Sequence, residues 1–245
     1  MTKDGRPSRI NDIRYFAGDK SSYLKGCEEA VAFGRRVALY LNGEGYSLGA
    51  HTALYLFLTS DLQPGGVRVT NEGGDWWQRY TYVGVPQGFP DFANASEIVA
   101  QATINALKAN RPDLSDLVES AARIVRTEAE NLRLLIKSRR TKKFIIDTAL
   151  AIDAWPRPSR LFLSLTELAS GTYLEAPSIS LAFYPEAFDL AGQIGVNTSA
   201  IQLSTKSSIG ARLTSERQGG ALVQMLDDFV PALRPTFSKL VKMRG

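Results

Sequence analysis

The stretch Gly45-Tyr46-Ser47-Leu48-Gly49, with His51 close behind, contains the residue types of a serine hydrolase. A nucleophile elbow holds a serine between two glycines on a sharp turn from a strand into a helix, and a histidine must accept the serine's proton. His51 is the only histidine in the 245 residues. On a helix leaving the elbow, it would point away from the reacting side of Ser47. The sequence therefore disfavours a hydrolase.

The same stretch also has the glycines of a phosphate-binding loop. A dinucleotide-binding loop follows a first strand and leads into a helix whose N-terminal amides meet the pyrophosphate. Here Gly43 and Gly45 follow the apolar run 37–41, but Gly49 stands one position too late. The next segment, 52–59, has the aromatic and aliphatic residues of a strand. We therefore expect a glycine-rich turn that joins two strands.

Metal and thiol chemistry have little support in the sequence. Cys27 and His51, 24 positions apart, cannot supply a standard zinc site. Neighbouring acids such as Glu28-Glu29 and Asp227-Asp228 do not face each other on a helix. Acids beside Cys27 would also raise the pKa of its thiol. We expect no catalytic residue, no metal and no cofactor, and an enzyme of unrecognised type stays as an alternative.

Composition indicates a soluble, cytoplasmic protein. Hydrophobic residues make up 44% and charged residues 22% of the chain, which is ordinary for a globular fold. A single cysteine rules out an internal disulfide, and the polar start of the chain lacks the apolar core of a secretory signal. No apolar stretch approaches the roughly 18 residues of a spanning helix, so no membrane partner is expected.

The positive charge is concentrated in two segments. Residues 1–36 carry eight basic and five acidic groups, and residues 111–143 carry nine and five, whereas residues 144–245 carry nine of each. The densest run lies at 137–143, where cations would complement the C-terminal dipole of a helix. The alternative is a basic patch that binds nucleic acid or an acidic protein. This predicted patch comprises Arg133, Lys137, Arg139, Arg140, Lys142 and Lys143.

Aromatic residues are concentrated in the segment 75–85, D-W-W-Q-R-Y-T-Y-V-G-V. On a strand, Trp76, Gln78, Tyr80 and Tyr82 would share one face, opposite Trp77. Tryptophan, tyrosine and arginine dominate binding hot spots, and aromatic rings also stack on single-stranded bases. The alternative is that both rows are packed in the core. The predicted partner-binding residues are Glu72, Asp75, Trp76, Trp77, Arg79, Tyr80 and Tyr82.

The pattern of elements predicts strands followed by helices in each half of the chain. Residues 1–20 are polar and mixed in charge, with a start that is expected to be frayed, and 21–34 are expected to form a short helix. Short apolar runs between glycine turns predict an antiparallel meander over 37–85, from the segments 37–41, 52–59, 67–70 and 76–85. The pattern Asn94-Ala95-Ser96-Glu97 suits a helix cap. Helices are predicted over 94–110 and 115–138.

The second half is expected to repeat this order. Strands are predicted over 144–152, 161–165, 179–183 and 201–205, and a final helix over 219–233. Clustered strands favour an α+β fold over a doubly wound α/β fold. We expect a single globular unit over 1–245. Its alternative subdivision is 21–112, a linking helix within 113–143, and 144–245.

These observations favour a non-catalytic protein that binds another protein. An immunity or inhibitor protein that neutralises a toxin in a stable complex has these general properties, as a class-level analogy. Nucleic-acid binding through the basic run is the first alternative. If the chain binds another protein, replacing Trp76 and Trp77 with alanine should weaken that protein complex by about 2–4 kcal/mol without unfolding the chain. The sequence identifies neither the partner nor the oligomeric state.

Overall fold

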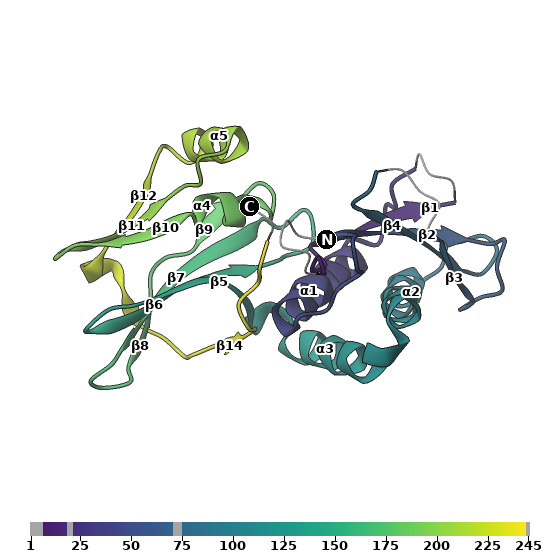
Figure 1. Cartoon of the computed structure of the whole chain (residues 1–245), viewed down its shortest axis with the longest axis horizontal. Coiled ribbons are helices and arrows are strands. Elements are labelled where there is room, and N and C mark those ends of the chain that lie inside the picture. The colour runs from purple at the N-terminus through teal and green to yellow at the C-terminus, as the bar shows by residue number, and fades with distance from the viewer. Residues whose placement is uncertain (1–6, 19–21, 71–74, 244–245) are drawn as a thin grey trace. The chain divides into compact units, whose positions relative to one another are not determined.

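The computed structural model describes residues 7–18, 22–70 and 75–243, and it divides the chain into two compact units (Figure 1). Unit 1 comprises Met1–Ala129 with Lys242–Gly245, and unit 2 comprises Glu130–Val241. Unit 2 is thus one continuous segment whose two ends both join unit 1. About 30% of the structure is helical and 34% is strand, so the α+β class is confirmed at this broad level.

Unit 1 contains a mixed four-stranded sheet in the order β1-β2-β4-β3. β1 and β4 both run parallel to β2, and only β3 is antiparallel to its neighbour β4. The predicted antiparallel meander over 37–85 is therefore wrong, although its three later segments are strands. The strands are β1 (Asp12–Ala17), β2 (Ala53–Thr59), β3 (Val67–Thr70) and β4 (Gln78–Gly84).

Helices cover one face of this sheet (Figure 1). The hydroxyl of Tyr15 on β1 lies 3.0 Å from that of Thr103, and the amide of Asn110 donates to Thr81 on β4 at 2.9 Å. The predicted helix over 94–110 is confirmed, but Asn94 makes no side-chain cap. The helices are α1 (Glu28–Glu44), α2 (Ala95–Asn110) and α3 (Ser115–Glu128), with a 3-10 turn at Pro112–Leu114.

The segment 37–41 belongs to α1 and is not a strand. Val37, Ala38, Leu39 and Leu41 are all fully buried. They form an unbroken apolar run because this part of α1 is enclosed on several sides by β1, α2 and α3. A buried helix then has no polar face to reveal its period, so a short apolar run is ambiguous between helix and strand. The short helix predicted over 21–34 begins only at Glu28 and continues as α1, and Asp12–Ala17 within the polar segment 1–20 forms β1.

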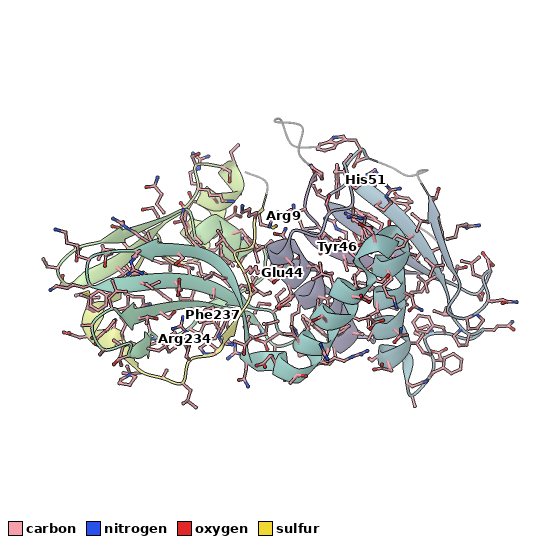
Figure 2. The ribbon with its side chains drawn as sticks, turned by 60° about the horizontal axis from the view of Figure 1, so that its bottom comes forward. Arg9, Glu44, Tyr46, His51, Arg234 and Phe237 are labelled. Atoms are coloured by element: carbon pink, nitrogen blue, oxygen red, sulfur yellow. The ribbon has the colours of Figure 1, made fainter. Side chains whose placement is uncertain are left out.

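The glycine stretch connects α1 to β2 and is not a hairpin loop. Gly45 ends α1 with φ 91°, a left-handed conformation that glycine adopts without steric cost. The buried Ser47 hydroxyl donates to the carbonyl of Ser8 at 2.5 Å. Tyr46 lies against the helices, and its hydroxyl donates to the carbonyl of Leu107 at 2.7 Å (Figure 2). Hydrogen bonds from this stretch therefore connect it to α2 and to the segment that precedes β1.

Unit 2 is built on a seven-stranded sheet, in the order β13-β8-β7-β6-β5-β14, with β9 also paired to β7. A second sheet has the order β10-β11-β12. The strands are β5 (Leu132–Arg140), β6 (Phe144–Ala151), β7 (Ser159–Glu167), β8 (Tyr173–Glu175), β9 (Ile179–Leu181), β10 (Gln193–Val196), β11 (Ala200–Ser204), β12 (Leu222–Met225), β13 (Val230–Pro231) and β14 (Thr236–Phe237). The helices are α4 (Glu186–Leu190) and α5 (Ile209–Arg217), with 3-10 turns at Ala129–Asn131 and Leu226–Asp228.

The predicted strands of the second half are confirmed in position, whereas the helix predicted over 115–138 is too long and the helix predicted over 219–233 is wrong. The helix over 115–138 ends at Glu128, because Ala129 takes a positive φ of 43° and the chain continues as β5. The segment 219–233 forms β12, a 3-10 turn and β13. The helix of that region, α5, lies earlier and ends before Gly219 and Gly220, both at positive φ. The β-then-α order of two similar halves is not confirmed.

The last strands of unit 2 lie at opposite edges of its large sheet. β13 pairs with β8 at one edge, and β14 pairs with β5 at the other. The segment between them, which carries Arg234, therefore passes from edge to edge (Figures 1 and 2). Phe237 packs against Tyr173 with ring centroids 6.3 Å apart, which holds this segment to the sheet.

Candidate functional site

The face of the unit 1 sheet opposite the helices carries a set of aromatic side chains. We call this the aromatic face, and it consists of Phe16, Tyr55, Phe57, Tyr80 and Tyr82. Strand register explains the arrangement, because Phe16, Phe57 and Tyr82 are direct neighbours across β1, β2 and β4, as are Tyr55 and Tyr80 across β2 and β4. Residues two apart on a strand share a face, so the two rows lie side by side.

One row is a continuous stack of rings. Tyr23, Phe16, Phe57 and Tyr82 follow one another with successive ring centroids 4.9 Å apart and interplanar angles of 29°, 21° and 23°. Arg68 of β3 ends the row, its guanidinium carbon 4.7 Å from the centroid of Tyr82. The ring spacing matches the distance between strands, about 4.8 Å, so the sheet itself sets the stack.

The second row is shorter and also has an arginine at one end. Tyr55 and Tyr80 stack with centroids 5.5 Å apart at 18°. The guanidinium carbon of Arg14 on β1 lies 5.4 Å from the centroid of Tyr55. Gln78 links the two hydroxyls, since its amide donates to Tyr55 at 3.1 Å and its carbonyl oxygen accepts from Tyr80 at 3.2 Å.

This stacking determines what the aromatic face presents to a ligand. The ring faces of Phe16, Tyr55, Phe57, Tyr80 and Tyr82 are directed at neighbouring rings or at an arginine. Their edges and hydroxyls are therefore the parts turned away from the sheet. Phe16, Tyr55 and Phe57 are buried, so the half-buried Trp77, Tyr80 and Tyr82 are the rings that a ligand can reach. Ring edges favour flat packing against another apolar surface, and they offer few free ring faces for a planar ligand to stack on.

The two tryptophans that precede β4 differ in exposure and packing. Trp76 is 67% exposed. Trp77 packs edge-on against Tyr55, with centroids 5.8 Å apart at 69°, so it joins the same face as Tyr80. The predicted alternation placed it on the opposite face. That placement is wrong because β4 begins only at Gln78, and Trp77 precedes the regular pleat. The exposed Asp75 lies beside them and accepts from Gln78 at 3.4 Å.

The remaining predicted partner-binding residues lie elsewhere. Arg79 is on the opposite face of β4, where burial lowers its pKa. Nearby, burial and then the charge of Arg79 hold the pKa of His51 below its ordinary value. Glu72 lies outside the described residues. The structure thus brings together Trp77, Tyr80 and Tyr82, with Asp75 and Trp76 at their border.

Several residues of this face were missing from the sequence prediction. No strand was predicted over 1–20, so Arg14 and Phe16 were missed, although D-I-R-Y-F-A alternates with period two. Tyr55 and Phe57 lie on a predicted strand, and their two-residue spacing was the available signal. Which strands would be neighbours depended on the parallel crossovers, and no local pattern carried that information.

The predicted basic patch is not one cluster. Arg133 lies over Phe162, 3.7 Å from its ring centroid, and burial lowers its pKa. Lys137 and Arg139 donate to the carbonyls of Gly192 and Ile194. The run begins within β5, so its predicted place at the end of a helix is wrong. Its exposed side chains with no hydrogen bond or ion pair among the described residues are Arg140, Lys142 and Lys143, at the β5–β6 hairpin.

The reactive residue types do not form a site. Ser47 and His51 have separate hydrogen-bond partners, the carbonyl of Ser8 and the backbone of Trp76. Burial raises the pKa of the Cys27 thiol, in the direction predicted. Within the described ranges, no group of three or more His, Cys, Asp or Glu side chains could hold a metal ion. In the same ranges, no helix is long and apolar enough to cross a membrane.

Comparison of the chain with protein-family models, with curated proteins and with solved structures gives no match.

Proposed function

We propose that this chain is a non-catalytic protein-binding protein, and that the aromatic face of unit 1 is its contact surface. The observation that carries the proposal is the helix-free face of the sheet, where the half-buried Trp77, Tyr80 and Tyr82 pack against buried rings and the exposed Trp76 comes next in the chain. Aromatic residues with a flanking arginine are the types enriched in binding hot spots.

The ring geometry favours a protein over a single-stranded nucleic acid. Proteins that stack bases on a sheet offer open ring faces, whereas most ring faces here are directed at neighbouring rings. The basic run adds little to a nucleic-acid surface, because three of its six cations are engaged within unit 2. Only a dense cationic surface would supply the phosphate contacts that dominate such binding.

In this proposal the chain acts by forming a stable complex. An inhibitor or immunity protein that neutralises its partner is the form of such a protein that we propose. Its core interaction is burial of the partly exposed Trp77, Tyr80 and Tyr82, with Trp76 as a peripheral anchor.

The test is a comparison of two exposed tryptophans. Trp76 is 67% exposed beside the aromatic face, and Trp155 is 76% exposed in unit 2. Both alanine variants should keep the stability of the wild type, since neither side chain is buried. Each protein is used to capture partners from native lysate, with and without nuclease, and the affinity of any stoichiometric protein is then measured.

We expect a captured protein that resists nuclease, binds the Trp155→Ala variant normally, and binds the Trp76→Ala variant more weakly by about 2–4 kcal/mol. Equal binding to both variants would contradict the placement of the contact surface. Capture of material that nuclease removes would contradict protein binding and favour the basic run.

A further inference from the structure

The charged groups at the two ends of the aromatic face differ in how they are neutralised. This inference rests on the proposed function and concerns the chemistry of the partner. Arg14 donates to Asp12 at 3.3 Å, and the same carboxylate lies 3.7 Å from Arg35. Arg14 therefore already has its counter-charge within unit 1.

Arg68 has no such counter-charge among the described residues. It is exposed on β3, and its contact is with the ring of Tyr82. A guanidinium on an aromatic ring keeps its N–H donors available, because these donors lie in its own plane and point outward from it. Those donors match the two oxygens of a carboxylate, with which arginine forms bidentate hydrogen bonds.

We infer that the partner is a protein that presents a carboxylate to Arg68 at the β3 edge of the aromatic face. The half-buried rings of Tyr80 and Tyr82 supply the apolar contact, and the guanidinium supplies a charged contact at the β3 end of the stack. Stacking on Tyr82 limits the freedom of the Arg68 side chain, so less entropy is lost when the carboxylate binds. An acidic surface is thus complementary to this edge.

A carbodiimide cross-link tests this contact directly. The reagent adds to a carboxylate and activates it. A nearby primary amine then attacks the activated carbonyl carbon, and the reagent leaves as a urea, so that an amide forms. A guanidinium does not couple in this way. The Arg68→Lys variant places an amine at the proposed contact, and the Arg212→Lys variant places one on the exposed surface of α5 as a matched control. Each full-length variant is cross-linked to the captured protein, and the joined peptides are identified by mass spectrometry.

We expect an amide between position 68 and an aspartate or glutamate of the partner, and none from position 212. The Arg68→Glu variant should weaken binding by roughly tenfold or more, because like charges then face each other. Higher salt should weaken the wild-type complex more than the complex of an Arg68→Gln variant.

The outcomes separate the two proposals. If Trp76→Ala weakens the complex while the Arg68 variants bind normally and give no cross-link, the aromatic face binds a protein and the acidic contact is wrong. If neither Trp76→Ala nor the Arg68 variants change binding, the proposed contact surface fails, and this inference fails with it.

Discussion

The hydroxyl of Tyr15 lies over Gly34 of α1, in the space that a Cβ at position 34 would occupy. A Cβ added there would lie 1.6 Å from the Tyr15 oxygen and 3.3 Å from the methyl of Thr103. The Thr103 hydroxyl donates to the carbonyl of Val99 at 2.8 Å, so the 3.0 Å contact with Tyr15 has the tyrosine as donor. Gly34 therefore lets α1 approach the sheet and leaves room for a buried hydrogen bond.

Replacing Gly34 with alanine should destabilise unit 1 by about 1–3 kcal/mol, because the new methyl displaces Tyr15. The measurement is urea unfolding by tryptophan fluorescence in a Trp155→Phe background, where both remaining tryptophans belong to unit 1. In the double variant with Tyr15→Phe the clash with the hydroxyl is gone. Its destabilisation should be smaller than the sum of the two single changes, and simple additivity would contradict the close approach.

Phe57 should stabilise the fold, in contrast to the exposed Trp76. Phe57 is 1% exposed between Phe16 and Tyr82 in the stacked row. The Phe57→Ala change should cost about 3–5 kcal/mol of unfolding free energy, from lost burial and the cavity left behind. Trp76→Ala should change it by less than about 0.5 kcal/mol. Both variants are unfolded in urea and followed by circular dichroism, which does not depend on the tryptophans. Similar losses for both would show that Trp76 is part of the core.

Strands with clear alternation or compact apolar runs were predictable from the sequence, and so were α2 and α3, although α3 was predicted to run ten residues too far. The aromatic segment 75–85 was also recognisable as a candidate surface, because Tyr80 and Tyr82 stand two residues apart on a strand. The sheet order was not predictable. It depends on the parallel pairing of β1 and β4 with β2, which is decided by packing between distant segments.

Two errors show why local patterns failed. Val37 to Leu41 resembles a buried strand because α1 is enclosed, so its period was hidden. Leu132, Leu135 and Ile136 continued the apparent helical spacing of α3, but Ala129 at φ 43° breaks the helix. Alanine is a strong helix former, so tertiary structure overrides its propensity at that position. Each aromatic residue of this face could be read from the sequence. Only the pairing register between the strands shows that their rings lie in rows.

Asn42 should anchor the segment that returns from unit 2. Its side chain is fully buried and donates to the carbonyls of Ile10 at 2.7 Å and Lys242 at 3.2 Å, and it accepts from the backbone N–H of Lys242 at 2.7 Å. Asn42→Ala should cost about 2–4 kcal/mol, because several buried backbone groups lose partners. The backbone amide of Lys242 should then exchange hydrogen faster in Asn42→Ala. In an Asn105→Ala control the same amide should exchange as slowly as in the wild type. Unchanged exchange would contradict the anchor.

An ion pair should stabilise the packing of α5 on α4 in unit 2. Arg217 lies 2.6 Å from Glu186, whose side chain is 6% exposed while that of Arg217 is 53% exposed. Arg217→Ala leaves a largely buried carboxylate without its cation. Allowing for solvent screening of the exposed arginine, the loss should be about 1–3 kcal/mol. Replacing both residues, as Glu186→Gln with Arg217→Met, should cost less than Arg217→Ala alone. The stabilities are compared by thermal unfolding. A double variant that is less stable than Arg217→Ala would contradict the ion pair.

His51 should make the folded chain less stable as the pH falls. Burial, followed by the charge of Arg79, lowers the pKa of His51 in the folded state below the ordinary value, which is about 6.5 when the chain is unfolded. The unfolded state therefore binds more protons below that pH, so the free energy of unfolding is unaffected above about pH 7 and decreases as the pH falls through 6.5 towards the folded pKa. Because His51 is the only histidine, the His51→Gln variant removes this titration entirely. Urea midpoints at pH 7.5 and 5.5 should fall more for the wild type than for the variant. An equal fall, or a larger one for the variant, would show that His51 is readily protonated in the fold.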